Sequence, residues 1–205
     1  MLRTITGYAG FDTTYAFLAE KQDYLNNKIW LFAFYTHVFT SLFALVAGFT
    51  QFSTYLMKYY KKLHRNMGKL YIVNALFINV PAGFIMAINA NGLWPSRLAF
   101  LILGGLWLYF TYKGWRSAIS SDFKAHRRWM IRSYALTFSA ITLRTWRIVL
   151  APVVPDPHIL YMIDAWMGFV PNILLVEWFL RREKKNKILP VKVNSNSIKQ
   201  TATYN

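Results

Sequence analysis

Five stretches of about 20 residues, each nearly free of charge, constrain what this chain can fold into. A helix of that length crosses the ~30 Å hydrocarbon core of a bilayer, whereas a membrane-spanning strand needs only ~10 residues. Hydrophobic residues make up 55% of the 205-residue chain and charged residues only 16%. The sequence therefore predicts an all-α fold, an integral-membrane bundle of about five transmembrane helices. The expected spans are Ile29–Phe52, Leu70–Ala90, Leu98–Ile119, Trp129–Leu150 and His158–Leu180.

The net charge of +16 comes from three basic clusters that alternate with the spans. One cluster lies between spans one and two, another between spans three and four, and the last begins at Arg181. Because Lys and Arg near span ends stay in the cytoplasm, the amino end is predicted outside and the carboxyl end inside. Residues 1–28 then form an outer-face segment, with a short helix expected at about Thr14–Leu25. Residues 29–182 form the bundle, and residues 183–205 form a basic, disordered cytoplasmic tail.

The position of the charge also bears on partners. A pI of 10.1 could indicate a nucleic-acid partner, but basic clusters confined to one side of a membrane favour the lipid bilayer. Anionic lipids at the cytoplasmic face are the expected contacts, and no nucleic acid is expected. The chain has no cysteine, which excludes a secreted disulfide scaffold. We expect a multi-pass protein of the cell membrane, specifically the bacterial inner membrane.

Polar residues within the spans indicate which helix faces turn away from lipid. In span one, small and polar residues recur at steps of three and four from His37 to Gln51, a pattern typical of helix–helix packing. In span four, a stripe of the same kind runs without a break from His126 to Arg147. Both faces are predicted to lie inside the bundle.

Arginine inside a span requires a partner or a water-filled cavity. Arg144 lies in the outer half of span four, and Asp164 in span five is its nearest acidic candidate. Glu177, near the inner end of span five, is expected to pair with Arg132 or Arg65.

Two of the four histidines lie at the cytoplasmic ends of different spans, and each precedes arginine: His64-Arg65 and His126-Arg127-Arg128. Such a pair can supply the two axial ligands of a haem iron, while arginines neutralise its propionates. Haem b is therefore the candidate cofactor, with His64 and His126 as candidate iron ligands. The same residues equally suit an ordinary basic membrane interface. A zinc site is disfavoured, because the chain has neither an HExxH pair nor a cysteine.

Two motifs resemble the bacterial predicted membrane proteins grouped as domain of unknown function 2306. They are LHRNMGKLYI, starting at Leu63, and DFKAHRRWMIRSYALTFSAITLR, starting at Asp122; the resemblance covers about Phe17–Leu150. Lys69 stands where that pattern usually has arginine, which keeps the charge but loses bidentate geometry. The resemblance supports the fold and carries over no activity. It marks a set of signature positions: His37, Gln51, His64, Arg65, Gly68, His126, Arg127, Arg128, Trp129, Met130, Arg132 and Arg144.

Three functions stay open at this level. The first is a redox module that binds haem b or a quinone near the inner histidines. The second is a non-catalytic subunit or assembly factor of a larger membrane complex. The third is a small transporter or lipid-binding protein that uses the inner basic pocket and Arg144. Whether the protein is an enzyme is not decided by the sequence.

The predicted orientation can be tested with a reporter that is active only outside the cytoplasm. Alkaline phosphatase fused to the carboxyl end should be inactive, because the basic clusters hold that end inside. Robust phosphatase activity of the fusion would contradict the orientation.

Overall fold

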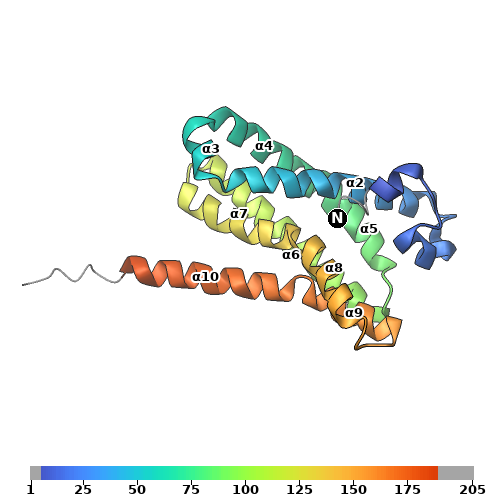
Figure 1. Ribbon diagram of the computed structural model, residues 1–205. Helices are drawn as coiled ribbons and strands as arrows, with labels where there is room; N and C mark the ends of the chain where they lie inside the picture. Colours follow the sequence, from blue (N-terminus) through green and yellow to red (C-terminus); the bar gives the residue numbers. More distant parts are fainter. Residues whose placement is uncertain (1–5, 189–205) are drawn as a thin grey trace, which may run out of the picture.

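The computed structural model describes residues 6–188, and within that range the chain is helical with no strand. Figure 1 shows long helices that run side by side. The chain begins with two 3₁₀ helices, and one element is a π-helix. The elements are η1 (Tyr8–Gly10), η2 (Ala16–Tyr24), α2 (Lys28–Gln51), α3 (Thr54–Tyr59), α4 (Lys61–Val73), the π-helix η3 (Asn74–Asn79), α5 (Val80–Ile88), α6 (Leu93–Ile119), α7 (Phe123–Thr137), α8 (Ser139–Leu150), α9 (Pro157–Met167) and α10 (Val170–Ile188).

Four helical segments are long and apolar enough to cross a membrane. They are Lys28–Gln51, Lys61–Ile88, Leu93–Ile119 and Pro157–Lys185. The fourth expected span, Trp129–Leu150, is helical but divided between α7 and α8, and neither helix has the length of a span. The integral-membrane helical bundle is thus confirmed, whereas the count of five spans is not.

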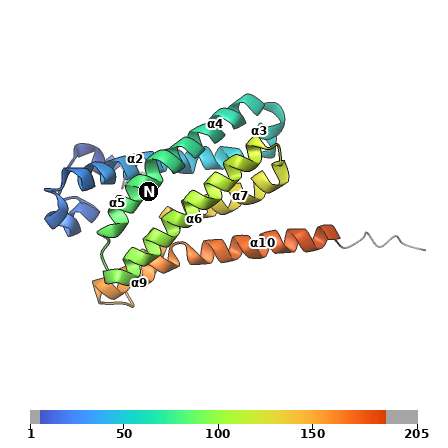
Figure 2. The ribbon, with the colours of Figure 1, turned by 180° about the vertical axis from the view of Figure 1, so that it is seen from behind.

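The described residues of the three basic clusters lie toward the same end of the bundle. In both views, α3, the start of α7 and the far end of α10 point toward one end, while η1, η2 and α9 lie toward the other (Figures 1 and 2). The alternation of charge along the chain therefore has a spatial counterpart. Which end faces the cytoplasm remains a prediction.

A π-helix interrupts the second span just before Pro81. Proline has no N–H to donate to the preceding turn, so the backbone pattern has to change near it. Hydrogen bonds in a π-helix join residues five apart, which brings Asn74 and Asn79 toward a common face. Asn79 Nδ2 donates to Asn74 Oδ1 at 2.8 Å. This side-chain bond partners two amides that would otherwise be costly inside a membrane.

The breaks in spans four and five lie beside each other. Helix α7 ends at Thr137, and α9 ends shortly before Pro171, whose ring cannot continue the helical hydrogen bonds. Asn172 Nδ2 lies 3.2 Å from both the Ala135 and Gly168 carbonyl oxygens and 3.0 Å from Thr142 Oγ1. Side-chain polar groups therefore partner backbone carbonyls around both breaks, as a bilayer interior requires.

Small residues let the helices approach closely. A Cβ atom on Gly48 would overlap the Tyr134 ring, so α2 and α7 are in contact there. Gly114 of α6 meets Met130 of α7 in the same way, because a Cβ atom there would overlap the sulfur. Packing through small residues is the usual means of helix association in lipid.

The amino-terminal segment folds over the first turns of α2. The side chains of Tyr8 and Leu18 are buried against Trp30 and Phe34. Lys21 is buried as well and donates to the Asn89 carbonyl at the end of α5. Burial lowers the pKa of the Lys21 ammonium below its ordinary value. The short helix expected at Thr14–Leu25 is present as the 3₁₀ helix η2, Ala16–Tyr24, with a kink at Lys21.

The boundary expected at residue 183 does not coincide with the end of a helix. Helix α10 continues to Ile188, because residues 181–188 contain no helix breaker. The rest of the predicted tail, residues 189–205, lies outside the described residues. The assignment of residues 1–28, 29–182 and 183–205 to outer segment, bundle and tail stays a prediction.

The tight contact at Gly48 can be tested by adding a single methyl group. Gly48→Ala should lower the stability in detergent by about 1–3 kcal/mol, since the methyl would overlap the Tyr134 ring. Gly105→Ala is the matched control, because a Cβ atom there meets nothing within 4 Å. Equal unfolding temperatures of Gly48→Ala and Gly105→Ala in detergent would contradict this packing.

Candidate functional site

The two inner histidines lie near each other at the end of the bundle that carries the basic clusters. His64 on α4 is close enough to His126 on α7 for their charges to interact. His126 Nδ1 is hydrogen-bonded to the Gly114 carbonyl oxygen at 2.8 Å. If Nδ1 donates this bond, Nε2 is left as a lone-pair donor. His64 Nδ1 is buried and has no hydrogen-bond partner.

Helix register explains why the histidines share a depth. Tyr71 follows His64 by seven residues, and Ser133 follows His126 by seven residues. The Tyr71 hydroxyl and Ser133 Oγ are hydrogen-bonded at 2.7 Å. Both helices run away from the basic end, so each histidine lies two turns, about 10 Å, before this bond. Whether the two imidazoles meet in one pocket stays a prediction.

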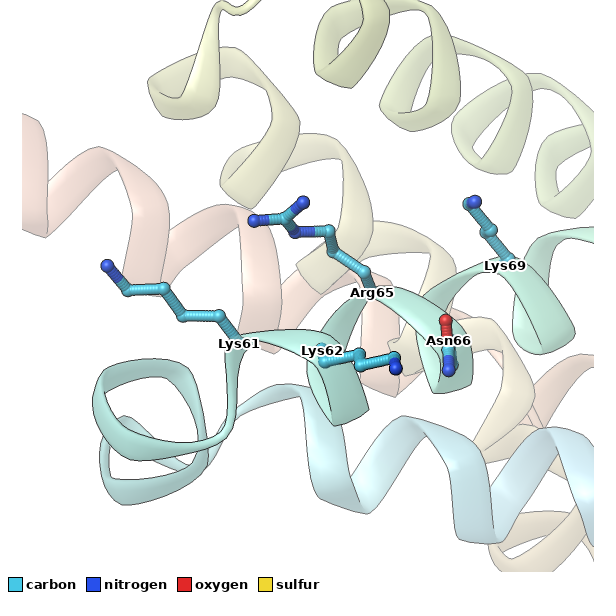
Figure 3. Close-up of a pocket in the computed structure, with 5 residues that line it drawn as sticks. All are labelled: Lys61, Lys62, Arg65, Asn66 and Lys69. Carbon is cyan, nitrogen blue, oxygen red and sulfur yellow. The ribbon is translucent and has the colours of Figure 1, made fainter.

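A basic pocket of about 490 Å³ lies on α4, and its lining residues precede and follow His64 in the sequence. Lys61, Arg65 and Lys69 are spaced by four residues and rise from one side of the helix (Figure 3). Lys62 and Asn66 complete the lining from another side. Four cations around one hollow can bind phosphate or carboxylate groups.

Two arginines of α7 form ion pairs with glutamates of α10. Arg132 binds Glu177 through both Nε and Nη2, the latter at 2.9 Å from Oε2, so Arg132 rather than Arg65 is the partner of Glu177. Arg127 reaches Glu183 of α10 with a contact at 2.8 Å. A fork-like guanidinium suits such two-point contacts with carboxylates.

Two other signature positions of α7 differ in their surroundings, because Trp129 packs against neighbouring side chains and Arg128 is exposed. Trp129 lies against Tyr109 and Phe110 of α6, with ring centroids 5.8 Å apart in both cases, and beneath the Arg132 guanidinium. The Arg128 side chain is exposed, and its charge acts on Glu177. These residues fix α7 between α6 and α10.

A fully buried network of hydroxyl groups lies two turns beyond the inner histidines along the same helices. The Tyr71 hydroxyl is bonded to Ser133 and Thr137, both at 2.7 Å, and accepts a bond from Trp107 Nε1 at 3.1 Å. Thr111 Oγ1 donates to the Trp107 carbonyl and is bonded to Ser133, both at 2.7 Å. The network joins α4, α6 and α7. The stripe on span four predicted that Ser133 and Thr137 face inward, but nothing in the sequence marked Tyr71 as their partner.

His37 belongs to a separate polar group between α2 and the π-helix. His37 Nδ1 is 3.1 Å from the Asn79 carbonyl oxygen, and Ser41 Oγ donates to Asn79 Oδ1 at 2.9 Å. Gln51, at the other end of that face, bonds Thr50 Oγ1 at 3.2 Å. The polar face of span one is therefore a packing face. His37 lies in the group around Asn79, whereas the Gln51 side chain lies against Gly68 of α4, one turn after His64.

The pairing expected between Arg144 and Asp164 is wrong. Arg144 Nη1 donates to the Ala140 carbonyl of its own helix at 2.6 Å, and its charge acts on Tyr8. Arg147, one turn further along α8, lies 3.7 Å from Asp164 Oδ2. The stripe from His126 to Arg147 places both arginines on the same helix face, so the sequence alone could not decide which of them contacts Asp164 in span five.

Ligands for a bare metal ion are scarce. Among residues 6–188, no group of three or more His, Asp or Glu side chains could hold an ion. The two inner histidines fit a cofactor that brings its own ligands better than a free cation.

A helical bundle with apolar spans and internally paired polar side chains defines the class of integral-membrane proteins. The family described as predicted membrane protein (DUF2306) has a model that matches residues 34–180, more than half of the chain, so the chain belongs to that family. The match includes span five, beyond the expected region Phe17–Leu150, and starts later. No curated protein and no solved structure matches the chain.

Removal of one hydroxyl tests the buried network. Tyr71→Phe should lower the stability by about 1–3 kcal/mol, because Ser133, Thr137 and Trp107 each lose a buried partner. Tyr109→Phe is the control, since Tyr109 is largely exposed and its contacts are made by the ring. Thermal unfolding in detergent measures both variants. An equal loss of stability in Tyr71→Phe and Tyr109→Phe would contradict the network.

Proposed function

We propose that this protein is a membrane redox module that binds haem b at its inner end, with His64 and His126 as axial ligands. The observation that carries the proposal is the pair of imidazoles at one depth on two neighbouring helices. A haem b held by two histidines transfers single electrons.

The ligand count favours haem over other metals. Two imidazoles leave a zinc or iron ion without a full set of protein ligands. A porphyrin supplies four nitrogen ligands, so two axial histidines complete six-fold coordination. The absence of a third metal-ligating side chain in the described part of the chain supports this choice.

The surroundings of each histidine suit this role. A metal-binding histidine usually donates the N–H of its second ring nitrogen to a carbonyl or carboxylate oxygen, which fixes the orientation of the ring. The Gly114 carbonyl oxygen can accept such a bond from His126 Nδ1. The unpartnered Nδ1 of His64 is consistent with a ring that gains a partner only when a cofactor is bound.

The basic side chains supply charge for propionates. Arg65 and Lys69 rise from the same side of α4, and Arg65 directly follows His64 in the chain (Figure 3). Arginine and lysine bind carboxylates through charge-assisted hydrogen bonds. The same pocket can accept the phosphate of an anionic lipid when it is not used by the cofactor.

The absorption spectrum of the purified protein tests the proposal. A Soret band that shifts on reduction with dithionite, with about one haem per chain, is the expected result. His64→Ala and His126→Ala should each lower bound haem about tenfold or more, because each removes an axial ligand. His158→Ala is the control, since His158 is exposed and lies at the start of α9, at the other end of the bundle.

A colourless preparation from cells supplied with haem would contradict haem binding. A quinone recovered from that preparation would instead favour quinone chemistry at the same site. A partner that co-purifies in a fixed ratio would favour the accessory-subunit hypothesis.

A small transporter is the second candidate. The π-helix in span two and the breaks in spans four and five support it, because transporters often bind substrates where helices are interrupted within the membrane.

A further inference from the structure

Asp164 on α9 is a buried carboxyl group without a hydrogen bond. The residue is 1% exposed, and neither of its carboxylate oxygens has a hydrogen-bond partner. The nearest cation is Arg147, whose Nη1 lies 3.7 Å from Oδ2, beyond hydrogen-bond distance. An ionised carboxylate in such surroundings is costly, because its lone pairs have lost water and gained no donor.

Arg147 is shared between two carboxyl groups. Its Nη2 lies 3.5 Å from Glu20 Oε1, and its guanidinium lies 5.8 Å from the centre of the Tyr161 ring. The Glu20 side chain is 49% exposed, whereas that of Asp164 is 2% exposed. Arg147 therefore lies between a buried carboxyl group and one in contact with solvent.

No other described cation competes for Asp164. Arg97 on α6 acts on Lys21, and Arg144 on α8 acts on Tyr8. Tyr161, on α9 itself, interacts with Asp164, Glu20 and Arg147. Among the described residues, the charge that acts on Asp164 is that of Arg147.

We propose that Asp164 is a proton-binding site in the outer half of the bundle, with Arg147 as the group that alternates between it and Glu20. When Arg147 pairs with Glu20, Asp164 takes a proton from water and becomes a neutral carboxylic acid. When Arg147 turns to Asp164, the proton returns to water and an ion pair forms. The proton is the ligand, and no electron or other group is transferred.

The position of Asp164 gives this proton a structural effect. The Asp164 carbonyl accepts the Gly168 N–H at 2.8 Å, so the residue belongs to the last turn before the chain breaks between α9 and α10. A change of charge here acts directly beside that break. The site is independent of the inner histidines, which lie at the other end of the bundle.

Infrared spectroscopy of the full-length protein tests the proposal directly, because a protonated carboxyl group has a C=O band distinct from that of a carboxylate. The wild-type protein should show a protonated band at neutral pH, and the band should disappear in alkali. Asp164→Asn should abolish the band. Asp23→Asn should keep it, because Asp23 is exposed.

Isotope labelling assigns the band without relying on the folding of a variant. Carbon-13 in the aspartate carboxyl group should shift the band, and Asp12, Asp23, Asp122 and Asp156 are all exposed. Arg147→Gln should move the loss of the band to more alkaline pH, since the cation that favours ionisation is gone. The proposal would be overturned by a spectrum with carboxylate bands alone at neutral pH. It would also be overturned by a protonated C=O band that does not shift with carbon-13 aspartate. Neither result depends on haem binding.

Discussion

The fold depends on the requirement that each polar group in the bilayer interior finds a partner within the protein. The Tyr71 hydroxyl illustrates this requirement, because it binds Ser133, Thr137 and Trp107 and so holds α4, α6 and α7 in one register. Hydrophobic burial cannot set that register, since lipid is as apolar as the helix surfaces. The register in turn fixes the position of everything two turns away, including the inner histidines.

Interruptions of the helices are tolerated for the same reason. The π-helix in span two pairs its own asparagines, and Asn172 bonds backbone carbonyls at the breaks in spans four and five. A break without such partners would expose carbonyl groups to hydrocarbon at a cost of several kcal/mol each. Most polar side chains at these breaks thus serve to satisfy backbone groups or each other. A buried polar group without such a partner is a better candidate for binding a ligand.

Among the described residues, Trp30 Nε1, the Tyr35 hydroxyl, His64 Nδ1 and the Asp164 oxygens are buried without a hydrogen-bond partner. Of these, His64 interacts with His126 and Asp164 with Arg147, and the two groups lie toward opposite ends of the bundle. At the end that carries the basic clusters, His64 Nδ1 is buried without a partner, on the same helix as the basic pocket. At the opposite end, the Asp164 oxygens are buried beside Arg147, which Asp164 shares with Glu20. The first arrangement suits an anionic cofactor that accepts imidazole ligands, and the second suits a proton. The proposed redox site and the proposed proton site are at opposite ends of the bundle, so each is tested by an experiment that does not depend on the other.

The sequence by itself determined the class of fold, the apolar spans, the family and the alternation of basic clusters, because these depend on length, composition and local motifs. It also narrowed the partner of Glu177 to Arg132 or Arg65, of which the structure shows Arg132, and it predicted one depth for both inner histidines, since helical rise converts sequence position into depth. Only the tertiary structure decided that Arg147, not Arg144, meets Asp164, and that span four breaks after Thr137. Those outcomes depend on helix rotation and on small differences in backbone hydrogen bonding, which are set by contacts between segments far apart in the chain.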